Sequence, residues 1–471
     1  MTNLDETLYV LSATLAISCV GIVVLGYFIG RRDLFLPSNF YLGGTALFIG
    51  VSGMRAASQQ HLVDYPPSAY HKLYAGFAVF FMGILLAYLL WRFPRRMAGR
   101  FFRKWAPINT GTMLLLSLLT IGLATVPLFP IPIPVVGQLI GKIFIHFGAF
   151  AFVFALAAWQ LDRSNPLCIL NLLFVGGYAG LLALSFGGGR RQLVGILLAA
   201  IIYGYWVWLR YKPRTVALCL LGAAFMGAWI FLQGYGYVRW RKGNEGGLAR
   251  AVESVQMVAR GAESAAKSSL FNTAQPSVEF TLLAIHMFTG VDRARDGIPF
   301  YAAYNIFANP IPRQFWPLQK PESLGKTLPE IGKEHYQFRG YGDVMWSINP
   351  VAYGFHDGGL FPILVYGLVI GGFLRFFDDL MIRQSTNPFL IGLLAASSGH
   401  ITGFARGSMD VMTWMLIGCV LGLFLLKFLS QLLFGTGTEY PRTDHVVNYP
   451  RFGQISNLVR RAKSGRQSFL L

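Results

Sequence analysis

Charged side chains are scarce in this sequence of 471 residues. Asp, Glu, Lys and Arg together make up 13% of the chain, about half the share of about 25% that is usual in a soluble domain. Hydrophobic residues reach 54%, and the mean hydropathy is +0.50. Several apolar runs reach about 18 residues or more, close to the length that crosses a bilayer as a helix. These features predict an all-α polytopic membrane protein in contact with the lipid bilayer. The net charge of +19 then belongs first to cytoplasmic loops, and we expect no nucleic-acid partner.

Cysteine and the common catalytic motifs are also lacking. The four cysteines lie in or beside apolar runs without CxxC spacing, which predicts small buried side chains and neither disulfides nor a structural metal. The sequence contains no P-loop, no GxGxxG after a strand, no HExxH and no GxSxG. No carboxylate falls convincingly at the middle of a predicted span, which argues against a proton-coupled transporter. We therefore expect no metal and no other cofactor.

The apolar runs and the basic residues between them predict a topology of about eleven transmembrane helices. The acidic start "MTNLDE" is expected outside, and the pair Arg31 and Arg32 inside, because Lys and Arg favour cytoplasmic loops. The basic patch at 91–105 is also predicted inside, as is the C-terminus. The predicted spans are 8–30, 34–54, 73–93, 109–130, 137–160, 167–186, 193–210, 216–235, 358–377, 387–404 and 410–434.

One large extracytoplasmic loop is expected at 236–357, between an N-terminal bundle of about eight spans (1–235) and C-terminal spans (358–434) followed by a basic tail (435–471). This loop holds thirteen Lys and Arg against eleven Asp and Glu. Within it, 248–271 is predicted to form an amphipathic helix, and 278–290 is too short to span and should pack on the bundle. We expect irregular coil, stiffened by proline, in the rest.

Arginines gather where the topology disfavours positive charge. The turn "GGGRRQ" carries Arg190 and Arg191 on the predicted outer side, and "NPIPRQFWPLQKPESLG" (309–325) carries Arg313 and Lys320. The guanidinium fork makes paired, charge-assisted hydrogen bonds to phosphate and does not lose its proton. A proline-stiffened loop that carries such groups over an apolar bundle suits a lipid-linked phosphate. The simpler alternative is that these cations anchor turns at the lipid headgroups or bind loop carbonyls.

Other polar residues of the same loop are weaker candidates. Arg293 and Arg295 lie among aspartates and could pair with them, and His356 with Asp357 could instead cap the following helix. On the inner side, "FFDDLM" most simply closes a helix beside Arg383. Among ionisable residues inside the predicted spans are Lys142, His146 and His400.

Three short segments resemble the Wzy-type polymerases of bacterial surface polysaccharides, which are related to the O-antigen ligases. They are "LSFGGGRRQLVGILL" (184–198), "IPRQFWPLQKP" (311–321) and "AYGFHDGGLFPILVYGLVIGG" (352–372); the segment "DLFLPSNFYLGG" (33–44) is similar to the N-terminal region of the family. The resemblance implies a GT-C-type glycosyltransferase in the cytoplasmic membrane. Its donor and acceptor would be undecaprenyl-diphosphate-linked oligosaccharides, and a chain-length regulator and a flippase are implied partners.

The chemistry of such a donor matches the residues present. A sugar C1 on a diphosphate already has a good leaving group, so arginines that stabilise its charge and a base for the acceptor hydroxyl suffice. On this hypothesis Arg190 and Arg313 bind the diphosphate, supported by Arg191 and Lys320. His356 or Asp357 acts as the base or orients the acceptor. Arg293 and Arg295 are further substrate-binding candidates. Many relatives place an acidic residue just before the tyrosine of "NPVAY", so that role would pass to Asp343 or Asp357.

Three rival functions stay open. A ligase would move finished polymer onto an acceptor, using the same chemistry. A flippase or other transporter of lipid-linked sugars would need large cavities and charges at the middle of the membrane, with little need for a long outer loop. A scaffold for a polysaccharide assembly complex would need no chemistry.

Overall fold

The computed structural model describes most of the apolar runs and part of the large loop. The described residues are 3–30, 32–59, 64–98, 104–129, 137, 140–141, 143–185, 190–224, 256, 277–290, 300–308, 311, 316, 323–325, 328, 348–407 and 409–437. For 128, 183–185, 190–193, 211 and 289–290 the backbone alone is described. The predicted amphipathic helix at 248–271 and the basic tail, from 438 onwards, lie outside this set apart from single positions.

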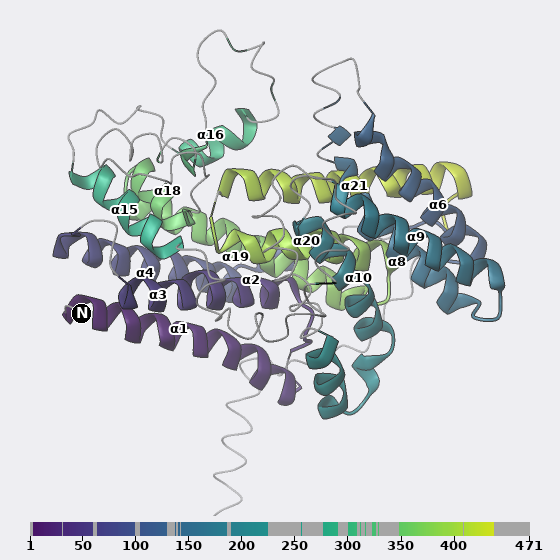
Figure 1. The fold of residues 1–471 in the computed structure, drawn as a ribbon, viewed down its shortest axis with the longest axis horizontal. Helices are drawn as coiled ribbons and strands as arrows, with labels where there is room; N and C mark the ends of the chain where they lie inside the picture. Colours follow the sequence, from purple (N-terminus) through teal and green to yellow (C-terminus); the bar gives the residue numbers. More distant parts are fainter. Residues whose placement is uncertain are drawn as a thin grey trace, which may run out of the picture.

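The described residues form helices and no β-strand, which confirms the all-α class (Figure 1). Short π and 3₁₀ segments at Ala46–Val51, Val126–Leu128 and Leu209–Tyr211 join or extend the α-helices. In chain order the α-helices are α1 Asn3–Phe28, α2 Pro37–Thr45, α3 Ser52–Ser58, α4 Pro67–Leu90, α5 Arg92–Ala98, α6 Thr110–Thr125, α8 Phe147–Leu161, α9 Pro166–Ser185, α10 Arg190–Val207, α15 Ser277–Gly290, α16 Tyr301–Ala308, α18 Pro350–Asp357, α19 Leu360–Arg383, α20 Pro388–Phe404 and α21 Met409–Phe434.

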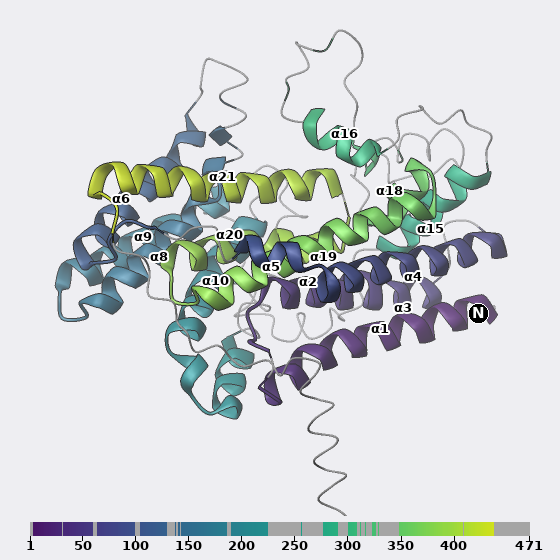
Figure 2. The same cartoon turned by 180° about the vertical axis from the view of Figure 1, so that it is seen from behind.

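Four of these helices, α1, α4, α19 and α21, are long and apolar enough to cross a membrane by length and composition. Shorter apolar helices include α6, α8, α20 and an additional one at Arg214–Ala224. The chain is therefore a multi-pass membrane protein, while the number of eleven spans stays a prediction. In both views of the ribbon the four long helices run along the long axis of the molecule (Figures 1 and 2).

The structure differs from the predicted segments in several places. The stretch predicted as one span at 34–54 is a continuous succession of α2, a π-helical segment and α3. In the large loop, 278–290 forms α15, whose apolar side chains from Val278 to Met287 are largely buried, as predicted. The prediction of coil elsewhere in that loop was wrong for α16 and α18, because both carry enough apolar residues to pack on the bundle.

Glycines let α19 pack tightly against α4. A Cβ atom at Gly83 of α4 would lie 2.7 Å from the carbonyl oxygen of Leu364. On α19, a Cβ atom at Gly367 or at Gly371 would lie even closer to the backbone carbonyl oxygen of Phe80 or of Ile84, respectively. In a membrane a helix gains no more apolar contact from another helix than from lipid, so helices associate through close packing. Small residues four positions apart allow the backbones to approach in this way. The pairing fixes the position of α19, whose first turns carry the candidate site.

Gly367→Leu is expected to destabilise the protein by about 1–3 kcal/mol, because the new side chain meets backbone atoms that cannot rotate away. Gly180→Leu in α9 is the matched control, since nothing lies within 4 Å of a Cβ at that position. There the helix should gain up to about 1 kcal/mol from losing a flexible glycine. Thermal unfolding in detergent measures both; equal shifts for the two variants would contradict the packing argument.

The two ends of the bundle differ in chemistry. The N-terminus lies at the same end as α15 and α18 (Figures 1 and 2). Beyond the C-terminal end of α1, Arg210 Nε and Nη2 donate to the two carboxylate oxygens of Asp33 at 3.0 and 3.1 Å. Asp378 does not simply close its own helix. It accepts hydrogen bonds from the backbone N–H of Ser38 at 3.0 Å and from the hydroxyl of Tyr88 at 2.6 Å, so it holds the N-terminus of α2 against α19.

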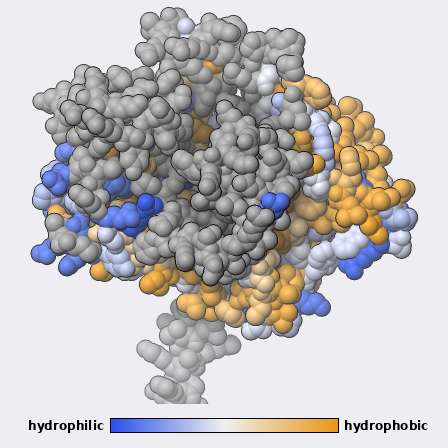
Figure 3. Space-filling model, viewed as in Figure 1, coloured by the Kyte–Doolittle hydropathy of each residue, from blue (hydrophilic) through white to orange (hydrophobic). Residues whose placement is uncertain are grey.

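The outer surface of the described bundle is apolar over wide areas (Figure 3). Exposed hydrophobic side chains follow α9 in particular, where Leu167, Leu170, Leu173 and Phe174 are each more than half exposed. Exposed apolar surface on this scale marks contact with lipid or with another protein, which agrees with a membrane environment.

Candidate functional site

The candidate site is built around the turn between α18 and α19. Gly358 and Gly359 form this turn with φ angles of +134° and +102°, values that residues other than glycine rarely adopt. The turn folds α18 back along α19, so Asp357 at the end of α18 meets Tyr366 in the second turn of α19. The hydroxyl of Tyr366 donates to Oδ2 of Asp357, and Nδ1 of His356 pairs with Oδ1 at 2.8 Å.

The carboxylate of Asp357 is completely enclosed by these contacts, with a side-chain exposure of 0% against 13% for His356. The interpretation of Asp357 as a helix cap was wrong, because α19 begins after Gly359 and receives no side-chain cap. Asp357 instead accepts a hydrogen bond from the phenol of Tyr366 and pairs with the imidazole of His356. A carboxylate on one ring nitrogen of histidine fixes the ring orientation and favours a proton on that nitrogen.

Aromatic rings hold the imidazole of His356 in place. The rings of Phe288 and Tyr301 meet it edge to face, at centroid distances of 4.9 and 5.1 Å. These two residues come from α15 and α16, so three separate helices of the large loop, α15, α16 and α18, meet around the imidazole. With Nδ1 directed at Asp357, Nε2 is the nitrogen able to accept a proton from a substrate hydroxyl.

An apolar groove of about 390 Å³ lies beside this polar cluster, between α19 and α21. Its lining includes Val369 and Leu421, whose exposures of 56% and 41% show that the rim of the groove reaches the outer surface. Tyr366 belongs to both features, since its ring lines the groove while its hydroxyl binds Asp357. The other lining residues are Tyr41, Phe300, Ala303, Ile306, Val365, Ile370, Phe373, Leu374, Ile401, Phe404, Met409, Thr413, Leu416, Ile417 and Val420.

Phe300 adopts an unusual backbone conformation where the groove meets the cluster. Its φ angle is +56°, a left-handed value that is a genuine outlier for a bulky side chain and costs about 1–2 kcal/mol. The ring of Phe300 lines the groove and packs edge to face on Tyr366 at 6.1 Å. Strain of this kind persists only where the surroundings impose it, and it concentrates at functional sites.

A second polar network surrounds Asp410 in the first turn of α21. Its carboxylate accepts hydrogen bonds from Nδ2 of Asn305 at 2.7 Å, from the hydroxyl of Tyr353 at 2.8 Å and from Ser323 at 3.3 Å. Burial, and then the Asp410 carboxylate, raise the pKa of Tyr353 well above its usual value, so this phenol stays a donor. The network joins α16, α18 and α21 to Ser323, which belongs to the proline-rich stretch 309–325.

The sequence did not predict this network. Acidic residues were expected to be functional at the middle of a span, whereas Asp410 lies at the start of the predicted span 410–434. The available signal was an aspartate at the start of an apolar run that follows a serine and a glycine. Asp410 is nevertheless fully buried, and its partners lie 57 to 105 residues away in the chain.

Asp410→Ala is expected to destabilise the protein by about 3 kcal/mol, since the buried donors of Tyr353 and Asn305 would each lose their acceptor. Asp162→Ala is the control, because Asp162 is partly exposed and accepts a hydrogen bond from the exposed Ser164; a change of about 0.5 kcal/mol or less is expected there. Limited proteolysis should also show faster cleavage within 309–325 in the Asp410 variant. An unchanged cleavage pattern would contradict the role of Asp410 in holding this stretch.

The remaining predicted residues are only partly placed. Arg190 and Arg191 form the first turn of α10. Tyr205, near the other end of α10, and Arg210 beyond it both bind Asp33, so the first turn of α10 lies at the end of this helix that is away from Asp33. The side chains of both arginines lie outside the described residues, as do Arg293, Arg295, Arg313, Lys320 and Asp343.

Metal-ligating side chains come together at a separate place in the described part of the chain, where His146, His400 and Cys419 are neighbours. Comparisons of the chain with models of protein families, with curated proteins and with solved structures gave no match.

Proposed function

We propose that the protein is a membrane glycosyltransferase that polymerises lipid-diphosphate-linked oligosaccharide repeat units into a surface polysaccharide. The observation that carries the proposal is the junction of the apolar groove with the His356–Asp357–Tyr366 cluster. A substrate with a long apolar tail and a polar reacting head needs these two surroundings side by side. The resemblance to Wzy-type polymerases supports undecaprenyl diphosphate as the carrier.

The reaction requires one bond to form and one to break. The acceptor hydroxyl attacks the sugar C1, the bond between C1 and the diphosphate oxygen breaks, and the diphosphate leaves with the electron pair. His356 Nε2 takes the proton of the hydroxyl. Attack from the face opposite the leaving group inverts the anomeric configuration. Arg190 and Arg313, supported by Arg191 and Lys320, neutralise the charge that grows on the diphosphate.

The enclosure of Asp357 supports a division of roles between the two catalytic candidates. Its carboxylate has no exposed surface and already accepts from Tyr366 and pairs with His356, so a substrate hydroxyl cannot reach it without displacing one of them. His356 is partly exposed and is therefore the base. Asp357 orients the imidazole and stabilises the charge that it gains, as the aspartate does in a catalytic triad.

The orientation follows from charge. Arg210, Arg383 and the basic helix α5 belong to the end that the positive-inside rule assigns to the cytoplasm. The cluster at the other end would face outwards from the cytoplasmic membrane of a bacterium, as would the N-terminus. Flipped repeat units would arrive there, and a chain-length regulator would act there on the growing polymer.

The test compares surface polysaccharide on gels from cells with the intact gene, a deletion, and Arg313→Ala or Arg190→Ala at matched protein levels. Collapse of a long ladder to one attached repeat unit in the deletion is the expected result. Accumulation of lipid-linked polymer with loss of attached polysaccharide would instead identify a ligase. An unchanged ladder in the deletion would overturn the proposal, and wild-type ladders in both arginine variants would overturn their assignment to the diphosphate.

A further inference from the structure

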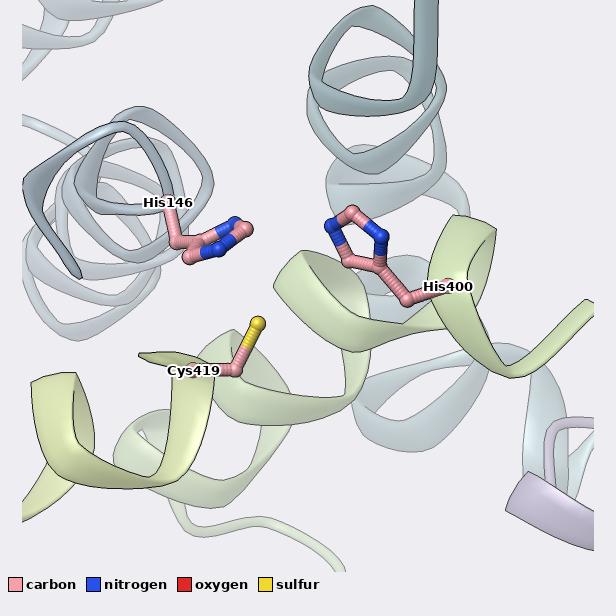
Figure 4. A group of neighbouring side chains, drawn as sticks. All are labelled: His146, His400 and Cys419. Carbon is pink, nitrogen blue, oxygen red and sulfur yellow. The ribbon is translucent and has the colours of Figure 1, made fainter. Parts of the chain in front are cut away.

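His146 meets His400 and Cys419, which come from the C-terminal part of the chain, in the interior of the bundle (Figure 4). Their potential ligand atoms all lie within 4.8 Å of one another, and the three residues are 2%, 1% and 0% exposed. His146 directly precedes α8, while His400 belongs to α20 and Cys419 to α21. Figure 4 shows the two rings and the sulfur directed toward a common space.

The distances are near those of a coordination sphere. Metal–nitrogen bonds of about 2.0 Å and metal–sulfur bonds of about 2.3 Å place ligand atoms about 3.5 Å apart. Side-chain rotations that move each ligand atom by about 1 Å would bring the two ring nitrogens and the sulfur to that separation. The thiol of Cys419 is free, so it is available as a ligand.

Packing alone accounts for only part of this arrangement. The two imidazole rings meet edge to face at 5.0 Å and 90°, which is a favourable contact for any pair of rings. However, Nε2 of His146 is buried without a hydrogen-bond partner among the described residues. A buried polar atom normally finds a partner because leaving it unpaired costs about 1–3 kcal/mol. A ligand in the space between the three side chains would supply that partner.

The donor set and its surroundings restrict the kind of ion. The thiolate is a soft ligand and the imidazoles suit zinc and copper, so this donor set selects copper(I) or zinc rather than magnesium or calcium. Within the described residues no carboxylate, third histidine or second cysteine joins the group, so three protein ligands are available. Two neutral imidazoles and one thiolate carry a charge of −1, which a monovalent ion balances to zero. A divalent ion would leave a net positive charge in an apolar interior, where unbalanced charge is costly.

We propose that His146, His400 and Cys419 form a buried three-coordinate site for copper(I). On binding, the thiol of Cys419 releases its proton to the solvent, the sulfur and two ring nitrogens bind the ion, and no oxidation or reduction occurs. The ion cross-links α20 and α21 to the segment that begins α8. Ile401 and Val420, the chain neighbours of two ligands, line the apolar groove, so the site would stiffen one wall of that groove. This inference is independent of the proposed glycosyl transfer.

The test uses the full-length protein in detergent under anaerobic conditions, with copper(I) kept reduced by ascorbate and buffered by bathocuproine disulfonate. We expect one copper(I) per chain and a higher Tm in the loaded protein, because an ion that binds only the folded state stabilises it. Cys419→Ser and His146→Gln should each weaken binding by about 100-fold or more, a loss at the upper end of that seen for outer-shell partners. Cys168→Ser is the matched control, since Cys168 is equally buried but lies in α9.

The Tm of the metal-free variants separates loss of a ligand from loss of the fold. A metal-free Tm equal to that of the wild type, combined with loss of the copper-dependent increase, supports the site. No copper bound by the wild type, or equal affinity in Cys419→Ser and Cys168→Ser, would overturn it. Retention of zinc at the same residues in competition with copper(I) would overturn the choice of ion.

Discussion

His356→Asn is expected to lower the rate of glycosyl transfer by about 10²–10⁴-fold, the usual contribution of a general base. The asparagine amide can still donate to Asp357 from about the position of Nδ1, which pairs with Oδ1 at 2.8 Å, so the fold around the site is conserved. The asparagine side chain has no nitrogen at the position of Nε2 that could accept a proton. The measurement is polymer formation by purified protein in liposomes that contain lipid-linked repeat units, at saturating donor.

Asp357→Asn tests the division of roles. Loss of the carboxylate removes the group that orients the imidazole, so a decrease in rate and a shifted pH–rate profile are expected together. His286→Gln serves as the control, because His286 lies in α15 and its ring packs edge to face on Tyr65. A normal rate in His356→Asn, with the Asp357 variant inactive, would transfer the role of base to Asp357.

Filling the apolar groove is expected to lower kcat/KM for a donor with a long lipid tail. Val369→Trp and Thr413→Trp together would place two indole rings in the space between α19 and α21. In a bilayer the lipid tail gains no burial from water by entering the groove, since the surrounding lipid is equally apolar. The groove therefore acts by positioning the head of the donor, and a displacement of about 1 Å at the reacting atoms can cost about 10²-fold. We expect a loss of about that size in kcat/KM for a long-chain donor.

The control for groove filling is Leu173→Trp, which adds the same indole to the exposed face of α9. A short-chain donor analogue provides the second comparison, because its tail would not occupy the whole groove. It should lose less activity than the long-chain donor in the double tryptophan variant. Equal losses for both donors would show that the substitutions damage the protein in general, and no loss for either would remove the groove from the reaction.

Sequence reasoning predicted most of the helices because their signal is local. The apolar runs that became α4, α19 and α21 need no distant partner to be recognised, since a bilayer requires about 20 apolar residues in succession. The same local reasoning was wrong at α16 and α18, where short helices are stabilised by burial against other elements. It also missed the π-helical segment between α2 and α3, which has no distinct composition.

At the site, His356, Asp357 and the two glycines after them could be predicted as neighbours from the sequence, because adjacent residues share a turn in any fold. Which other side chains contact them depends on the packing of the helices. This packing brought Tyr366 to Asp357, placed Phe288 and Tyr301 around the imidazole, and enclosed Asp410 among residues from α16, α18 and the proline-rich stretch. It also brought His146, with no spacing motif to announce it, to His400 and Cys419. Helix formation depends on neighbours in the chain, whereas a groove or a ligand cluster depends on which helix faces pack together, and these faces come from distant parts of the sequence.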